Sequence, residues 1–317
     1  MIESNPSIQE PPSPLPGWSF IVCAAEAGLR LDAYLCQRIP RISRARAARL
    51  AVIDLDAPER RLKKSSIVRT HQRLWVRRPV PDADAVLIAP EIIYEDQKLL
   101  VLNKPAGLAV HPTAARYRST VTHWLAHNRR GQRVEPVHRL DVETSGVLLC
   151  GKGLEAVRVL RRTFAEGHLE KTYLAVTEGV CARSEWTTDT PLGFDETSAI
   201  RLKMGPGRLE ARTDFRVKAQ DSKRALVEAL PRTGRQHQIR VHAALSGHPV
   251  VGDKLYGPDD ALFLAHLERP LSSTELERLG APRHALHATR LEFDFLGDRH
   301  RFEAPWPSLF TSLIENV

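Results

Sequence analysis

Residues 138–146 read His138-Arg139-Leu140-Asp141-Val142-Glu143-Thr144-Ser145-Gly146 and lead into the apolar run Val147-Leu148-Leu149-Cys150. The polar segment predicts a loop and the apolar run a buried strand. Loops at the end of a rigid sheet commonly carry catalytic groups, so Asp141 is a candidate for a carboxylate that faces a cleft. The alternative is a structural role, in which the Asp141 side chain caps the turn by accepting a hydrogen bond from the Glu143 or Thr144 amide.

On both sides of this stretch, strand patterns alternate with helix patterns. Apolar runs around a polar tip predict a hairpin over 92–102, and the spacing of Val157, Leu160 and Phe164 predicts a helix over 154–166. A further helix is expected over 233–247, with Thr233 and Gln236 as its capping box and Gly247 at its end. Other segments are a helix over 120–127 and strands over 171–176, 225–230 and 285–295. This order predicts an α+β fold with a mixed, largely antiparallel central sheet flanked by helices.

The composition indicates a globular protein with a polyanionic partner. The chain has 317 residues, 42% of them apolar, and a formal net charge of +8. From Arg30 to Arg78 there are 14 Lys and Arg against 4 acids, a surplus of ten. The positive charge is therefore concentrated in this segment, as a phosphate-binding surface requires, although a solvated helix face is the alternative. A helix is expected to begin at Ser43 and to present Arg44, Arg46 and Arg49 to such a partner.

The four cysteines are scattered and show no CxxC spacing, which is typical of buried thiols in a reducing compartment. The first 17 residues contain five prolines and two acids, and they lack the apolar run of a signal peptide. No uncharged stretch approaches the roughly 20 residues that span a bilayer. These features predict a cytoplasmic protein with no membrane association, a disordered tail over 1–18 and a linker over 80–84.

Four blocks in order resemble the RluA-type pseudouridine synthases. Residues 138–146 match the HRLDxxTSG signature of that family, and the other blocks lie at 94–112, 171–173 and 233–253. The resemblance implies the pseudouridine synthase fold over 86–317. Residues 19–85 resemble a small S4-like α/β RNA-binding module, degenerate because Asp54-Leu55-Asp56-Ala57-Pro58 replaces its usual turns.

The resemblance also implies an activity and its residues. Asp141 takes the position of the essential aspartate, Tyr173 that of the tyrosine against the target base, and Arg240 that of the arginine that pairs with the aspartate. The reaction isomerises uridine in structured RNA and needs no cofactor. Asp141 would attack C1′, attack C6 or remove a ribose proton, and the three routes stay open. The residues expected to bind the RNA are Arg139, His138, Thr144, Lys104, Arg235, Gln238, Arg44, Arg46 and Arg49.

The expected substrate is ribosomal RNA first and transfer RNA second, and the expected oligomeric state is a monomer. The alternative is a non-catalytic RNA-binding or ribosome assembly factor that retains the fold. No metal is expected, because the spacing of His237 and His242 fits no HExxH motif. These histidines, with His138 and His248, are interpreted as hydrogen-bonded structural residues.

Overall fold

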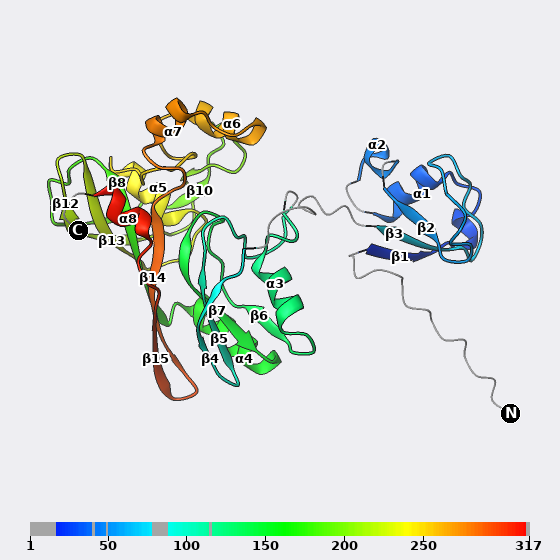
Figure 1. Cartoon of the computed structure of the whole chain (residues 1–317), viewed down its shortest axis with the longest axis horizontal. Coiled ribbons are helices and arrows are strands. Elements are labelled where there is room, and N and C mark those ends of the chain that lie inside the picture. The colour runs from blue at the N-terminus through cyan, green and yellow to red at the C-terminus, as the bar shows by residue number, and fades with distance from the viewer. Residues whose placement is uncertain (1–16, 40–41, 49, 78–87, 114–115, 315–317) are drawn as a thin grey trace. The chain divides into compact units, whose positions relative to one another are not determined.

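The computed structural model describes residues 17–39, 42–48, 50–77, 88–113 and 116–314. The chain divides into two compact units, Met1–Pro81 and Asp82–Val317 (Figure 1). The linker predicted over 80–84 lies outside the described residues, as does the predicted tail up to residue 16.

The smaller unit is a three-stranded antiparallel sheet, in the order β1-β3-β2, with two helices. Its elements are β1 (Gly17–Ile21), α1 (Leu31–Arg38), α2 (Arg44–Ala47), β2 (Val52–Asp54) and β3 (Arg73–Arg77), with a 3-10 turn at Ala24–Glu26. Leu31, Tyr34 and Leu35 of α1 pack with Leu74 and Val76 of β3 into one core. The helix predicted from Ser43 begins as expected but is only four residues long.

The predicted tail over 1–18 is corrected at its end. Gly17 and Trp18 belong to β1, where they pair with Arg77 and Val76 of β3. The Trp18 side chain also packs against the core of the smaller unit. Partial burial of this indole therefore stabilises residues 17 and 18 as part of the sheet.

The larger unit is built on a ten-stranded sheet in the order β4-β5-β7-β14-β8-β13-β12-β9, with β15 beside β14 and β6 beside β7. Among the described strand pairs, β7 and β14 are parallel and the other pairs are antiparallel. The strands are β4 (Glu91–Glu95), β5 (Leu99–Lys104), β6 (Val134–Pro136), β7 (Ser145–Lys152), β8 (Leu169–Glu178), β9 (Glu185–Thr188), β12 (Thr213–Gln220), β13 (Arg224–Pro231), β14 (Leu286–Phe295) and β15 (Asp298–Glu303). The predicted α+β class, with a mixed and largely antiparallel sheet, is confirmed.

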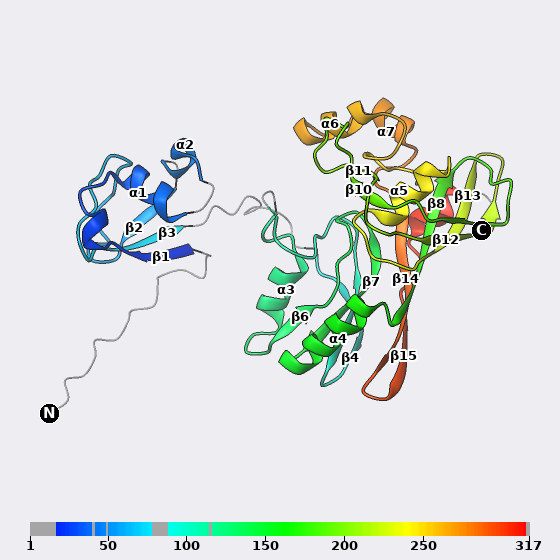
Figure 2. The same cartoon turned by 180° about the vertical axis from the view of Figure 1, so that it is seen from behind.

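Two helices bury opposite faces of the sheet around β5 and β7. Alternate residues of a strand point to opposite faces, so Leu99 and Val101 pack with α4 (Leu154–Glu166), whereas Leu100 and Leu102 pack with α3 (Val121–Asn128). Figure 2 shows α3 and α4 beside this part of the sheet. The predicted bounds of α4 are confirmed, and Gly167 closes it in the left-handed conformation. This double cover explains why the run after the Asp141 loop is uniformly apolar.

The other half of the sheet packs against α5 (Gln238–Leu245) and α8 (Ser308–Leu313). The shared core includes Leu174 and Val176 of β8, Ile239 of α5 and Phe310 of α8. A two-stranded sheet, β10 (Leu192–Phe194) with β11 (Met204–Pro206), lies beside α6 (Asp260–Glu268) and α7 (Ser273–Leu279) (Figure 2).

The start of α5 is not where the sequence predicted it. The helix begins at Gln238, because the preceding His237 adopts the left-handed conformation with φ 56°. Thr233 does tie back to the helix, but its hydroxyl donates to Gln238 Oε1 at 2.6 Å, and Gln236 is not its partner. The capping box is therefore wrong, whereas Gly247, with φ 82°, follows the end of the helix as expected.

No helix within the described part of the chain is long and apolar enough to cross a bilayer.

Candidate active site

Asp141 lies in the loop before β7, and the backbone of that loop closes its own turn. The Thr144 amide donates to the Asp141 carbonyl at 3.2 Å, which leaves the carboxylate available for another partner. Gly146 follows with φ 111°, and a Cβ there would lie 2.1 Å from the Ala288 carbonyl oxygen. Only glycine allows β7 to approach β14 this closely, so it sets the position from which the loop projects.

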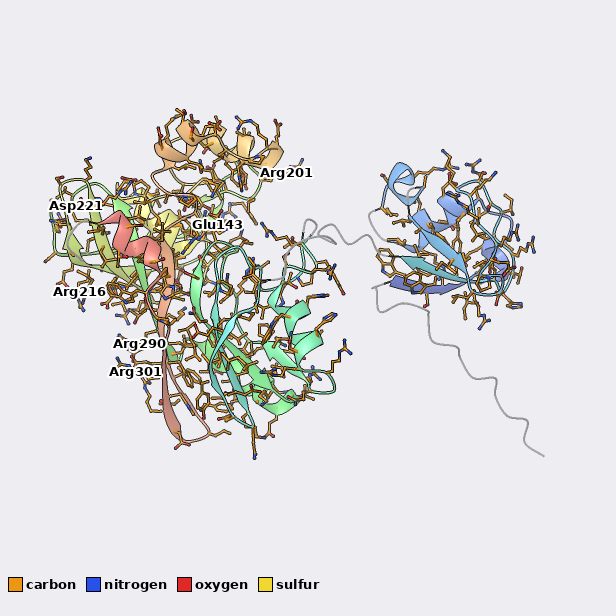
Figure 3. The ribbon with its side chains drawn as sticks, in the orientation of Figure 1. Glu143, Arg201, Arg216, Asp221, Arg290 and Arg301 are labelled. Atoms are coloured by element: carbon orange, nitrogen blue, oxygen red, sulfur yellow. The ribbon has the colours of Figure 1, made fainter. Side chains whose placement is uncertain are left out.

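Side chains from distant segments hold the loop from behind. Glu143, labelled in Figure 3, accepts from Lys254 Nζ at 2.7 Å and from the His284 amide at 3.2 Å. His284 Nε2 lies 2.8 Å from Thr144 Oγ1. Burial raises the pKa of the Glu143 carboxyl, but His284 and Lys254 together hold it below its ordinary value. Glu143 is thus an ionised anchor of the loop rather than the second carboxylate of a reacting pair.

Arg240 of α5 joins two carboxylates. Its Nη1 donates to Asp141 Oδ2 at 2.8 Å. Its Nε and Nη2 donate to Asp253 Oδ2 and Oδ1 at 2.6 and 2.7 Å. The side chain is buried beneath the ring of Tyr256, 5.1 Å from the ring centroid. A guanidinium is planar and forked, so its two-point contact with Asp253 orients the third donor toward Asp141.

Asp253 was not predicted to have a role of its own. Its carboxylate is fully buried and also accepts the amides of Leu255 and Tyr256 at 2.9 and 3.1 Å. Burial raises its pKa, but the charge and hydrogen bonds of Arg240, together with the hydrogen bond from the Leu255 amide, hold the pKa below its ordinary value. The signal for this residue in the sequence was its place at the end of the block over 233–253, directly after Gly252. The structure adds that a Cβ on Gly252 would lie 2.1 Å from the Arg283 carbonyl oxygen.

The protonation state of Asp141 follows from the same contacts. Burial raises the pKa of its carboxyl, whereas the charge and hydrogen bond of the Arg240 guanidinium lower it. The net shift is downward, so the carboxylate is ionised at neutral pH. Burial also lowers the pKa of His237 and His284 to about 4, so their rings are neutral there. A buried, ionised and oriented carboxylate can act as a nucleophile or a general base.

A cavity of about 630 Å³ opens in front of this carboxylate. Its volume is within the range of ligand pockets. Asp141, Tyr173 and Arg240 all line it, so the structure brings together the three residues proposed from sequence. Burial, and then the charge of Asp141, raises the pKa of the Tyr173 hydroxyl, which therefore keeps its proton.

Two of the residues expected to bind RNA are exposed at this cavity. Arg139 and Arg235 both line it, and Arg235 Nε donates to the Glu210 carbonyl at 2.9 Å. Arg44, in the smaller unit, keeps 61% of its side chain exposed with its Nε 3.4 Å from Asp32. The Arg46 side chain and Arg49 lie outside the described residues.

Lys104 was expected to contact RNA, and the structure corrects this. The side chain is fully buried, and its Nζ donates to the carbonyls of Pro105, Leu108 and Val142 at 3.0, 2.8 and 3.2 Å. Burial lowers the pKa of the ammonium to about 7. Because Val142 follows Asp141, Lys104 ties the end of β5 to the loop from inside.

Thr144 and Gln238, also expected to bind RNA, line the cavity but are buried and hydrogen-bonded within the protein. Thr144 is 2% exposed and bonded to His284. Gln238 is 4% exposed, and its carboxamide accepts from the Arg235 amide and donates to the Arg212 carbonyl. Because their polar atoms already have partners in the protein, both side chains support the cavity wall.

His138 lies in the wall of the cavity. Its Nε2 accepts the Leu149 amide at 3.0 Å, and its ring stacks on Phe164 with centroids 4.5 Å apart. Burial, and then the charge of Lys171, lowers the pKa of the ring to about 3. The other histidines also use ring nitrogens within the protein, since His237 Nδ1 lies 2.8 Å from Tyr256 Oη and His242 Nδ1 lies 2.9 Å from Thr213 Oγ1.

Comparison with known proteins identifies similar sequences and structures. Residues 98–245 match the family model described as RNA pseudouridylate synthase. A ribosomal large subunit pseudouridine synthase D from Neisseria meningitidis serogroup B is 36% identical over 299 residues, which cover 89% of this chain and 77% of that one. An uncharacterized RNA pseudouridine synthase of Bacillus subtilis, YhcT, is 36% identical over 62% of this chain and 68% of its own. The solved structure of human RNA pseudouridylate synthase domain containing 1 superposes with a TM-score of 0.56 at 27% identity, covering 69% of this chain and 84% of that chain.

Proposed function

Since this chain belongs to the RluA-type family of RNA pseudouridine synthases and is an isomerase, we propose that it converts specific uridines of large-subunit ribosomal RNA to pseudouridine. Several relatives that match over most of the chain are named for the ribosomal large subunit, which supports this choice over transfer RNA. The enzyme acts in the cytoplasm as a monomer.

The observation that carries the proposal is the contact of Asp141 with Arg240 at the wall of the cavity. Isomerisation breaks the bond between N1 and C1′, turns the base, and joins C5 to C1′. The proton lost from C5 balances the one gained at N1, so no outside reactant is consumed. The Asp141 carboxylate acts on the ribose or the base, Arg240 keeps it ionised, and the Tyr173 ring offers the uracil a flat apolar face.

The target uridine has to leave its stack to reach a buried carboxylate. Extruding a base costs a few kcal/mol and least in loops and bulges. A loop or bulge uridine is therefore the favoured target, and Arg139, exposed at the cavity, occupies the space that the extruded nucleotide leaves or contacts a phosphate.

The direct test is a comparison of pseudouridine maps of ribosomal and transfer RNA from cells with and without the gene. We expect one or a few positions in large-subunit ribosomal RNA to lose the modification, and the purified protein to restore it in vitro. Restoration by an Asp141→Ala protein would contradict the catalytic assignment. Unchanged maps in both RNA classes would favour the non-catalytic RNA-binding factor.

The smaller unit supplies sequence-independent affinity for RNA in this proposal. Five exposed basic residues have no carboxylate partner within the described part of the unit, and they fall in one segment: Arg60, Arg61, Lys63, Lys64 and Arg69. By contrast, Arg30, Arg44 and Arg73 are each paired with an acid. The segment 60–69 is therefore the stronger candidate for phosphate contacts.

Changing Arg61, Lys63 and Lys64 together to Gln is expected to weaken RNA binding and to flatten its salt dependence. Each lost phosphate contact lowers the slope of log K against log salt by about 0.9, so the slope should fall by up to about 3. Binding to a ribosomal RNA fragment, measured from low to moderate salt, gives this slope.

The matched control removes the same charge from the larger unit, by Gln at the exposed residues Arg183, Lys218 and Lys223. An equal loss of slope in the control and the test variant would mean that segment 60–69 has no special part in binding. Turnover of a short RNA should persist in both variants.

A further inference from the structure

Lys171 is a cation in the cavity wall that the proposed reaction leaves without a role. It lies on β8 two residues before Tyr173, so both side chains project from the same face of the strand, and both line the cavity. Its Nζ donates to the Thr233 carbonyl at 3.0 Å. A Cβ on Gly234 would lie 3.7 Å from the same nitrogen. The ammonium therefore sits between β8 and the loop that leads to α5.

The charge of Lys171 is not compensated by an acid in the described part of the chain. Within the described residues the Lys171 ammonium donates one hydrogen bond, to the Thr233 carbonyl, which satisfies one of its three N–H donors. Burial alone accounts for the lowering of its pKa to about 8, with no carboxylate to oppose it. Even so, the ammonium is mostly charged at neutral pH.

The other cations at the cavity differ in this respect. Arg240 has Asp141 and Asp253, and Arg232 Nε lies 2.8 Å from Asp214 Oδ2. Arg139 and Arg235 are exposed, so water solvates their charges. Lys171 is only partly exposed, so water solvates its charge incompletely, and among the described residues no acid is paired with it. An incompletely compensated ammonium in a cavity is stabilised when an anion enters.

We propose that Lys171 binds a phosphate adjoining the extruded uridine, while Tyr173, two residues further along the same strand, faces the base. This rests on the proposed function, because it takes RNA as the ligand of the cavity. The two N–H donors that Thr233 does not use favour an oxyanion as the ligand, because a charge-assisted hydrogen bond to phosphate is stronger than a neutral one. Lys171 is thus a substrate-binding residue and not part of the bond-making step.

The test combines a side-chain change with a change in the RNA. A stem-loop around a mapped uridine is made with the intact backbone, or with a neutral methylphosphonate at the phosphate on the 5′ or the 3′ side of that uridine. For the intact RNA, Lys171→Met should raise KM about 10- to 100-fold, as expected for one charge-assisted contact, with kcat within about threefold. One of the two methylphosphonates should raise KM similarly for the wild-type protein and add little further in Lys171→Met.

The controls separate binding from structural support. Lys171→Arg should recover most of the affinity, and Lys218→Met, which removes an exposed lysine of β12, should leave KM unchanged. Independent, additive effects of Lys171→Met and either methylphosphonate would overturn the proposal, as would a fall in kcat with KM unchanged. If Lys171→Met does not fold, the wild-type protein and Lys171→Arg still test the proposal. A wild-type KM that neither methylphosphonate changes overturns the proposal. A wild-type KM that rises with one methylphosphonate, together with an active Lys171→Arg protein, supports it.

The proposed function can fail separately. If the wild-type protein forms no pseudouridine in any mapped RNA, the isomerase proposal fails, and Lys171 is then judged by binding of uridine 5′-monophosphate, uridine 3′-monophosphate and uridine. Tighter binding of either monophosphate that is lost in Lys171→Met supports the phosphate contact. Equal binding of all three ligands overturns it.

Discussion

Asp141→Asn is expected to lower the rate of pseudouridine formation by on the order of 10⁴-fold while the protein stays folded. The amide keeps the shape of the side chain and one acceptor for Arg240, which lies 2.8 Å from the carboxylate in the native protein. It removes the charge that a nucleophile or general base needs. Single-turnover kinetics on an RNA that contains the mapped uridine measure the loss.

The matched control is Asp298→Asn, which removes an exposed carboxylate at the start of β15, next to the turn that joins it to β14. Figure 3 labels Arg290 and Arg301 on this hairpin. The control should keep full activity, and both variants should bind the RNA as tightly as the wild-type protein. An Asp141→Asn protein that retains even a tenth of the wild-type rate would remove this residue from the chemistry.

Asp253→Asn is expected to cost about 3–5 kcal/mol of the free energy of unfolding, because it leaves the buried Arg240 guanidinium without its main counter-ion. That is a large part of the roughly 5–15 kcal/mol that stabilises a typical domain. Activity should fall as well, since the two-point contact at 2.6 and 2.7 Å is what orients Arg240 toward Asp141. Denaturant unfolding at neutral pH measures the first effect.

The comparison for Asp253 is Asp260→Asn, which breaks the exposed pair with Lys203 and should cost no more than about 1 kcal/mol. The double change Asp253→Leu with Arg240→Met removes both buried charges and should restore much of the stability without restoring activity. If Asp253→Asn were as stable as Asp260→Asn, the ion pair would not be a structural support of the site.

Local patterns predicted the elements whose signal lies within one segment. The bounds of α4 follow from apolar spacing and a terminal glycine, and the β4–β5 hairpin follows from two apolar runs around a polar tip. The start of α5 did not follow, because the left-handed His237 interrupts an otherwise helical pattern. Its side chain is held by Tyr256, which is 19 residues away, and no local pattern encodes such a contact.

The site shows the same division. The resemblance proposed Asp141, Tyr173 and Arg240, and their common cavity is a finding of the structure. Lys104 was expected at the RNA from the resemblance, and lysine is usually exposed, yet three backbone carbonyls compensate its burial. Asp253 had no expected role because its importance depends on a partner 13 residues earlier on another element.

By itself, the sequence determined the α+β class, the loop that carries Asp141 and the basic character of residues 30–78, because periodicity, turn residues and charge are local properties. Only the tertiary structure decided which ionisable groups lie in the interior and which charges meet. It brings Asp141 and Arg240, 99 residues apart, within 2.8 Å, and among the described residues it pairs Lys171, in the cavity wall, with a carbonyl rather than an acid. The strength of a charge depends on burial and on its neighbours in space, and both are set by packing between segments.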